Sequence, residues 1–422
     1  MTALRGLEGD KLKDLTPLKK GPLAQALEAL NGEGEETRLV GGAVRDLALG
    51  GEAGDFDLAT TALPDEVIRR ARAAAIKVAL TGYAHGTVTL VVKGRPIEAT
   101  TLREDVDTDG RHAKVEFGRD FSADAGRRDF TINALSLGID GVVHDYVGGL
   151  DDLAAGRVRF IGDADVRIRE DYLRILRFFR FSARYAEGAL DAAGLEAAIR
   201  GRAGMARLSR ERVRAELFKL IVAPRASEVV RAMGERGFLE PILGGLAYPG
   251  RFARLIAIET ARGAKADAVL RLAALAAAIP ENAERLRERL RLANDEFERI
   301  AAAVAALAGL HGVEASPSLH ELRVLLFTAK RQAARDALAL AQAETSASAG
   351  DPAFSEADRF LATAPEPKLP FGGADLIARG VASGRRVGEI LRSFQALWIR
   401  AGFPKDPKTL GRLLDQASAE VE

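Results

Sequence analysis

The sequence predicts an α+β domain at the N-terminus and all-helical structure after about Asp163. Over the first 150 or so residues, short apolar segments alternate with glycine turns, which is typical of strands and their connections. After Gly149 the strand patterns fade, and Ala-rich amphipathic stretches continue almost to the C-terminus. The 422 residues exceed what one hydrophobic core usually serves. We therefore expect an extended molecule with several domains.

The composition is that of a globular protein, with 47% hydrophobic and 29% charged residues. The absence of cysteine excludes disulfides and Cys-ligated zinc. No apolar stretch reaches membrane-spanning length and no signal-peptide pattern is present, so we expect a cytoplasmic protein with no membrane partner. The 61 basic and 60 acidic residues nearly cancel, so a surface for nucleic acid would have to come from local clustering. The sequence does not indicate the oligomeric state.

A strand, a glycine turn, a short helix and a second strand are predicted between Arg38 and about Ala59. Gly41-Gly42 forms the turn, and Asp55-Phe56-Asp57-Leu58 forms the second strand. A glycine turn that opens a helix presents backbone N–H groups at a positive dipole end, which suits a triphosphate. Arg45 would add a bidentate donor for phosphate oxygens.

A helix from about Pro64 to Ala75 is predicted next, followed by a hairpin. In the hairpin, Thr87 to Val92 pairs with Ile97 to Leu102 around a turn at Lys93-Gly94. The polar segment from Arg103 to Gly126 is predicted to be a long connection, and such connections are often functional or mobile.

Three carboxylates are candidates for a metal site. Asp55 and Asp57 are two residues apart, so on a strand they would project from the same face. With Glu98 from the hairpin strand they would form an oxygen-lined site suited to Mg²⁺. Taken alone, Asp-x-Asp is more often a turn or a cap, and Glu98 fits a solvated strand position. The combination with the upstream glycine turn is what favours phosphoryl or nucleotidyl transfer.

The segment from Glu170 to Arg180 is predicted to be an amphipathic helix. Its apolar face comprises Tyr172, Ile175, Leu176 and Phe179, and its polar face comprises Asp171, Arg174, Arg177 and Arg180. The pattern by itself also fits a solvated, salt-bridged face, because Asp171 and Arg174 have the spacing of an intrahelical pair.

Further helices are expected near residues 190–200, 209–222, 266–279, 284–309 and 318–343. Segments that begin at Thr345 and Ala364 contain helix breakers and are predicted linkers flanking a last helical segment.

The segment Leu39 to Asp46, followed by Asp55-Phe56-Asp57, resembles the signature of the class II tRNA nucleotidyltransferase and bacterial poly(A) polymerase family. That family belongs to the polymerase β-like superfamily. The resemblance, which runs to about Pro224, implies a nucleotidyltransferase head, a helical neck, a helical body and a helical tail. We place them at residues 24–150, 151–224, 225–344 and 345–422.

Four later segments also resemble parts of this family. Arg127 to Leu135 resembles its second motif, which implies ribose and phosphate contacts for Arg128. Glu170 to Arg180 resembles its nucleotide-selecting motif, which implies that Asp171 and Arg174 bind the base edges of CTP and ATP. Arg177 and Arg180 then have supporting or phosphate-facing roles. Ser209 to Glu216 resembles a fifth motif that braces the neck, and Gly373 to Gly380 resembles the tail, which implies contact with the tRNA elbow.

The resemblance implies template-independent addition of CCA to the 3′ end of tRNA from CTP and ATP. Two Mg²⁺ ions would bind Asp55 and Asp57, with Glu98 as the third catalytic carboxylate. A-adding or poly(A) polymerase activity is the alternative within the family, because these activities share the head. A non-catalytic RNA-binding protein is disfavoured, since all three carboxylates are present. A metal phosphohydrolase based on His144-Asp145 lacks a second cluster of metal ligands.

Overall fold

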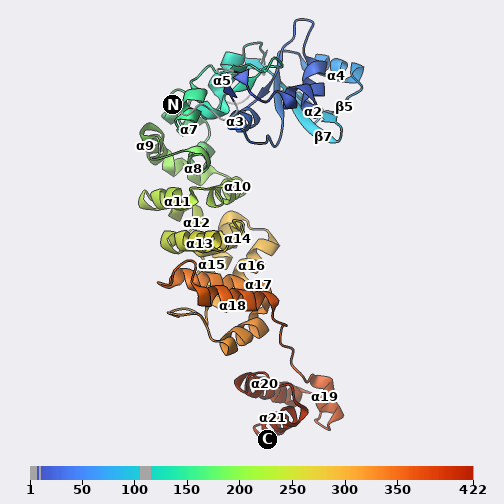
Figure 1. The fold of residues 1–422 in the computed structure, drawn as a ribbon, viewed down its shortest axis with the longest axis vertical. Coiled ribbons are helices and arrows are strands. Elements are labelled where there is room, and N and C mark those ends of the chain that lie inside the picture. Colours follow the sequence, from blue (N-terminus) through green and yellow to red (C-terminus); the bar gives the residue numbers. More distant parts are fainter. Residues whose placement is uncertain (1–6, 9–10, 105–115, 422) are drawn as a thin grey trace. The chain divides into compact units, whose positions relative to one another are not determined.

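The computed structural model (Figure 1) describes residues 7–8, 11–104 and 116–421. The chain divides into two compact units. The first unit covers Met1–Val229 and the second Val230–Glu422. The first contains all the strands that the structure describes, and the second is helical. Among the described residues, no helix is long and apolar enough to cross a membrane.

A seven-stranded mixed sheet forms the centre of the first unit, in the order β11-β10-β3-β4-β7-β6-β5. Its strands are β3 (Thr37–Val40), β4 (Asp57–Thr60), β5 (Lys77–Ala79), β6 (Thr87–Val92), β7 (Arg95–Thr101), β10 (Ser136–Leu137) and β11 (Val143–His144). Only β4 and β7 run parallel to each other. Two small ribbons complete the strands: β1 (Leu7–Glu8) with β2 (Lys11–Leu12), and β8 (Arg103–Glu104) with β9 (Glu116–Phe117).

Short helices surround this sheet: α1 (Thr16–Lys19), α2 (Pro22–Leu30), α3 (Gly42–Ala48), α4 (Pro64–Ala73), η1 (Tyr83–His85), α5 (Phe121–Arg127) and η2 (Thr131–Asn133). Helices α2 and α4 pack against each other and against β6 and β7. Leu27, Val67 and Leu90 are fully buried, so this side of the sheet carries the apolar core of the domain.

The predicted helix and hairpin are confirmed, as α4 and the β6–β7 pair. Lys93 and Gly94 turn the hairpin with φ of 51° and 80°, as a tight turn between strands requires. Strand β4 begins at Asp57, so Asp55 lies in the bend before it rather than on the strand. Helix α5 forms at the end of the connection predicted from Arg103. Asp120 caps the N-terminus of this helix by accepting a hydrogen bond from the Ser122 backbone N–H. Residues 105–115 of that connection lie outside the described residues.

The helices that follow the sheet are α6 (Gly149–Ala154), α7 (Ala164–Glu170), α8 (Leu173–Tyr185), α9 (Ala192–Gly201), η3 (Arg202–Arg207), α10 (Arg210–Ile221) and α11 (Ala226–Glu235). Ile175, Leu176 and Phe179 are fully buried, which confirms these three residues of the apolar face predicted for α8. Tyr172, the fourth, precedes the helix and is only partly buried. Its start was predicted too early. Asp171 has φ of −152° and separates α7 from α8. Asp171 therefore does not lie on the same helix as the three arginines of the predicted polar face.

The second unit contains α12 (Leu239–Leu243), α13 (Pro249–Ala261), α14 (Ala268–Ala276), α15 (Pro280–Leu290), α16 (Asn294–Leu307), α17 (Leu319–Glu344), α18 (Pro352–Thr363), α19 (Gly373–Ala378), α20 (Arg385–Arg400) and α21 (Pro407–Ala419). The stretch predicted at 284–309 is two helices, because Arg291 has φ of 52° between them. Lys330, with φ of 67°, kinks α17. The last three helices share an apolar core that packs on Val324 and Phe327 of α17.

Candidate active site

A cleft of about 510 Å³ in the first unit brings together residues from the sheet domain and from the helices after it. The predicted site residues that line it are Gly41, Gly42, Arg45, Asp57, Arg128, Asp171, Arg174, Arg177 and Arg180. The two other predicted carboxylates, Asp55 and Glu98, are not in the lining. The cleft therefore combines groups suited to phosphate with groups suited to a base edge.

At the glycine turn of the cleft, an added side chain would come close to two guanidinium groups. Gly41 has φ of 74°, and a Cβ atom there would lie 3.0 Å from Nη1 of Arg128. A Cβ atom on Gly42 would lie 3.2 Å from Nη2 of Arg45. Helix α3 has only seven residues, so its dipole is small. The positive charge at the turn therefore comes mainly from the guanidinium groups of Arg45 and Arg128.

Arg45 is buried and contacts three neighbouring side chains. Only 5% of the residue is exposed, and its Nε donates a hydrogen bond to Asp46 at 3.0 Å. Its Nη1 donates to the side-chain oxygen of Asn133, and its guanidinium lies 4.0 Å from the ring centre of Tyr185. Arg45 thus joins α3 to η2 and α8, and Nη2 is the nitrogen that lies beside Gly42.

The carboxylates meet at the parallel pair of strands. Asp57 is the first residue of β4 and pairs in register with Glu98 on β7, so both side chains project from the same face. Burial and the negative charges of Glu98 and Asp55 raise the pKa of Asp57, and Arg128 acts in the opposite direction. Like charges this close favour the binding of a cation.

The donor set fits a divalent cation that binds together with a substrate. In the described ranges, no group of three or more His, Asp or Glu lies close enough together to hold a metal ion by itself. Mg²⁺ usually keeps several waters and uses one or two carboxylates plus substrate phosphates. Asp55, Asp57 and Glu98 supply such oxygens at the edge of a cleft lined by arginines.

Asp171 and Arg174 do not pair with each other in the described part of the chain. Oδ1 of Asp171 accepts from the Leu173 backbone N–H at 3.0 Å, and Oδ2 accepts from Nη2 of Arg212 at 2.6 Å. Arg174 donates to the Glu170 carboxylate and, at 2.9 Å, to the Arg167 carbonyl. The intrahelical pair that the spacing allowed is therefore not formed. Both side chains line the cleft.

A continuous series of hydrogen bonds connects the two sides of the cleft. Arg177 donates to Oδ2 of Asp129 at 2.6 Å, and Oδ1 of Asp129 accepts from Asn133 at 3.1 Å. Asn133 in turn accepts from Arg45. Asp129 and Asn133 are 8% and 7% exposed, so little solvent screens these contacts.

Arg180 extends this network to α10. It donates to Glu216 at 2.5 Å, and burial lowers its pKa although Glu216 lies beside it. Arg180 and Glu216 thereby join the α8 wall of the cleft to α10.

Four residues of this arrangement were missed from the sequence: Asp129, Asn133, Arg212 and Glu216. Asp129 and Asn133 are four residues apart in one quoted motif, and Arg212 and Glu216 are four apart in another. For Arg212 and Glu216, both on α10, this spacing is the signal that could have found them, because on a helix such pairs share one face. Asp129 lies between α5 and η2 and shares no helix with Asn133, so helical spacing does not mark that pair. Their partners lie on other elements, which the sequence does not reveal.

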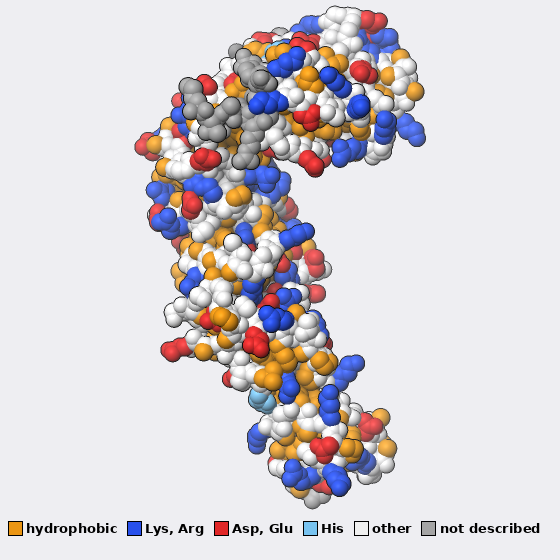
Figure 2. All heavy atoms as spheres, viewed as in Figure 1, with side chains coloured by type: hydrophobic (Ala, Val, Ile, Leu, Met, Phe, Trp, Pro, Cys, Tyr) orange, Lys and Arg blue, Asp and Glu red, His pale blue; other side chains and the backbone are white. Residues whose placement is uncertain are grey.

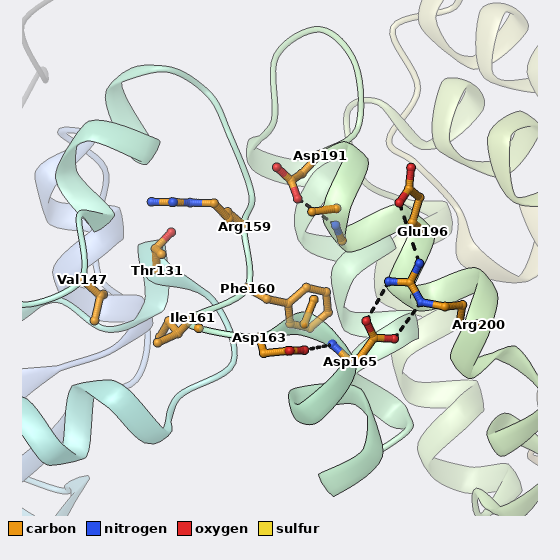
Figure 3. Close-up of a pocket in the computed structure, with 14 residues that line it drawn as sticks. Thr131, Val147, Arg159, Phe160, Ile161, Asp163, Asp165, Asp191, Glu196 and Arg200 are labelled. Carbon is orange, nitrogen blue, oxygen red and sulfur yellow. Dashed lines mark hydrogen bonds and ion pairs between the residues drawn. The ribbon is translucent and has the colours of Figure 1, made fainter.

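A second cavity in this unit, of about 610 Å³, is less suited to chemistry (Figure 3). Asp163 and Asp191 cap the N-termini of α7 and α9, and Arg200 lies between Asp165 and Glu196 (Figure 3). The carboxylates labelled in this cavity are therefore already engaged within the protein.

The His144-Asp145 dipeptide is structural. Asp145 accepts hydrogen bonds from the backbone N–H groups of Val147, Gly148, Gly149 and Leu150, and so organises the start of α6. Burial and the neighbouring Arg38 lower the pKa of His144. The geometry gives no support to a metal phosphohydrolase.

Two family models match the chain. The model described as "Poly A polymerase head domain" matches residues 37–159. The model described as "Probable RNA and SrmB- binding site of polymerase A" matches residues 194–248.

Curated relatives carry related names. The mitochondrial CCA tRNA nucleotidyltransferase 1 of Mus musculus is 32% identical over 374 residues, which are 88% of this chain and 84% of the relative. The Danio rerio protein of that name is 42% identical over 54% of each chain, and the Homo sapiens protein is 46% identical over 47% of this chain and 46% of its own. The chain thus spans about half the length of these last two relatives.

Solved structures share the fold. The crystal structure of the Bacillus stearothermophilus CCA-adding enzyme in complex with CTP has a TM-score of 0.69 at 27% identity, covering 95% of this chain and 99% of that one. The Thermotoga maritima CCA-adding enzyme complexed with tRNA has a TM-score of 0.67 at 20% identity, covering 97% and 99%, and shows likeness of fold.

Proposed function

Because the chain belongs to the family of CCA-adding tRNA nucleotidyltransferases, we propose that it adds CCA to the 3′ end of tRNA from CTP and ATP and releases pyrophosphate. One observation carries the proposal: a single cleft unites Asp57, beside Glu98, with the glycine turn and with Asp171 and Arg174. The names of the aligned relatives favour CCA addition over A-adding or poly(A) polymerase activity.

Members of this family use divalent metal ions. We propose that two Mg²⁺ ions bind Asp55 and Asp57, with Glu98 as the third catalytic carboxylate. Bound there, the ions would supply activation of the attacking hydroxyl and neutralisation of phosphate charge.

In the proposed reaction, the 3′-hydroxyl oxygen of tRNA forms a bond to the α-phosphorus of the nucleotide as the bond to pyrophosphate breaks. The turn at Gly41 and Gly42, with Arg128 and Nη2 of Arg45, binds and orients the triphosphate. Arg177 and Arg180 support the opposite wall through Asp129 and Glu216.

Selection of the base is proposed for the other side of the cleft. The carboxylate of Asp171 accepts from the exocyclic amine that cytosine and adenine share, and Arg174 donates to their ring acceptors. Uracil and guanine present the wrong donor and acceptor pattern to this pair. Arg212 holds the Asp171 carboxylate at 2.6 Å and so sets its orientation.

We propose that the functional domains are a head at 24–150, a neck at 151–224, a body at 225–344 and a tail at 345–422 that contacts the tRNA elbow. The head-domain match at 37–159 supports the first of these. We also propose a cytoplasmic location. Several relatives are described as mitochondrial, so cell fractionation is the test that distinguishes the two locations.

The experiment that tests the function uses the purified full chain, tRNA that lacks its 3′ CCA, and each labelled nucleotide in turn. CCA addition requires two cytidines and then one adenosine to be incorporated. Incorporation of adenosine only after a preformed CC end would indicate an A-adding enzyme, and a long adenosine run a poly(A) polymerase. Binding without incorporation would reject catalysis.

Loss of the Asp171 carboxylate is expected to relax nucleotide selection. Asp171→Ala should reduce discrimination against UTP by on the order of 1–3 kcal/mol, as for a bidentate base contact. Arg212→Ala should act in the same direction with a smaller effect, since it only orients Asp171. The measurement is kcat/KM for CTP and for UTP on the same tRNA.

Arg200→Ala is the matched control, because Arg200 pairs with Asp165 and Glu196 and does not line the cleft. Unchanged preference in Asp171→Ala would assign this segment to a structural role.

A further inference from the structure

The second unit contains an apolar cavity of about 540 Å³ that the proposed chemistry does not use. It lies between the end of α18 with residues 364–370 on one side and the C-terminal part of α20 with residues 403–410 on the other. Phe360, Trp398 and Phe403 line it, together with Pro365, Pro367, Pro370 and Pro404. Its volume is in the range of cavities that bind small organic groups.

Unpaired positive charge surrounds this apolar cavity. Arg323, Lys368 and Lys405 line it, are exposed, and have no ion-pair partner among the described residues. Glu366, the one acidic lining residue, already accepts from the Arg331 backbone N–H at 3.3 Å and lies 4.0 Å from its guanidinium. Basic and acidic side chains are mixed over most of the visible surface (Figure 2).

The turn beside the cavity has a strained backbone. Phe403 has φ of 63°, in the left-handed region that bulky residues rarely adopt. The conformation is held because the Phe403 ring lies 4.8 Å from that of Trp398, whose Nε1 donates to the Pro404 carbonyl at 2.9 Å. The packing therefore fixes a turn that brings Pro404 and Lys405 to the cavity.

We propose that this cavity receives one unpaired nucleotide of a bound RNA strand. The base would lie among the aromatic and proline side chains, and the flanking phosphates would contact Arg323, Lys368 and Lys405. A nucleotide carries a flat base and negatively charged phosphates. The aromatic and proline side chains of the lining suit the base, and its three cations suit the phosphates. The proposal rests on RNA being the substrate, as inferred above.

The lining also predicts that the identity of the base does not matter. It contains no Asn, Gln, Ser, Thr or His side chain, and the carboxylate of Glu366 is engaged by Arg331. Binding through stacking and phosphate contacts without hydrogen bonds to base edges is tolerant of sequence. The cavity would therefore recognise an unpaired position in RNA rather than a particular sequence.

Trp398 is the single tryptophan of the chain, so its fluorescence reports on this cavity directly. In the full-length protein, titration with tRNA or a short single-stranded RNA should quench it. Blunt duplex RNA without unpaired residues should not, nor should CTP, ATP or inorganic phosphate at concentrations that saturate nucleotide addition. Quenching by free nucleotide would show a mononucleotide site, and equal quenching by the duplex would reject the unpaired-nucleotide proposal.

Lys368→Ala/Lys405→Ala removes two of the cations without touching the core. We expect roughly fivefold weaker tRNA binding, loss of the quenching, and a shallower dependence of log K on log salt, by about 1.4 for two single-strand phosphate contacts. Lys408→Ala/Arg412→Ala is the matched control, since both residues are exposed on α21 and neither lines the cavity. Equal effects in the two double variants would overturn the proposal.

Nucleotide addition on the same preparations separates this inference from the proposed function. Quenching without addition would remove the proposed function and leave the cavity as an RNA site. If nucleotides are added but the two double variants bind RNA equally well, the cavity proposal alone is rejected. Truncation is unsuitable here, because deleting the last helices would expose Val324 and Phe327 of α17.

Discussion

Asp57→Asn is expected to lower the rate of nucleotide addition by at least about 10³-fold, because it removes charge from the proposed metal site. Asp55→Asn should have a similar effect, and Glu98→Gln a smaller one. The measurement is single-turnover addition of one cytidine over a range of Mg²⁺ concentrations.

The fold should survive this change. Asp57 is accessible from the cleft at the first position of β4 and lies outside the apolar core, although the atoms around its carboxyl group partly desolvate it and raise its pKa in the folded protein. A carboxyl group whose pKa rises on folding makes its ionised form unfavourable at neutral pH, and this cost disappears below the unfolded pKa. Removing the charge should therefore not lower the melting temperature.

Asp65→Asn is a suitable control, since Asp65 is an exposed carboxylate on α4 outside the cleft. Near wild-type activity of Asp57→Asn with the same metal dependence would exclude Asp57 as a metal-binding residue.

Asp129→Ala should give the second large effect, a loss of roughly 2–4 kcal/mol in the free energy of unfolding. Asp129 is 8% exposed, and its removal leaves Arg177 and Asn133 without their shared acceptor. The Arg177 side chain is 32% exposed, so water should reduce part of the cost. Urea unfolding followed by circular dichroism measures the effect, because Trp398 lies in the other unit and would not report on it.

A double-mutant cycle tests whether the loss comes from this pair. Asp129→Ala/Arg177→Ala should be less destabilised than the sum of the two single variants. The exposed Asp165–Arg200 pair is the matched control and should contribute much less, because solvent screens an exposed ion pair. If Asp129→Ala costs no more than Asp165→Ala, the network does not hold the two sides of the cleft together.

Local backbone requirements determined much of this protein from its sequence. The turn at Gly41, the hairpin turn at Lys93-Gly94 and the apolar face of α8 each depend on residues close together in the chain. Their conformations follow from glycine's freedom at positive φ and from the 3.6-residue helical period. For the same reason the motifs, and with them the family, were recognisable without a structure.

Only the tertiary structure decided which side chains meet. Asp57 faces Glu98 because β4 and β7 run parallel in one register, and no periodicity within either strand contains that information. Arg177 forms a hydrogen bond with Asp129, 48 residues away in the sequence. Asp171 pairs with Arg212, 41 residues away, although Arg174 was the nearer candidate partner for Asp171. Periodicity assigns a side chain to a face of its own element, whereas the partner depends on which element packs against that face.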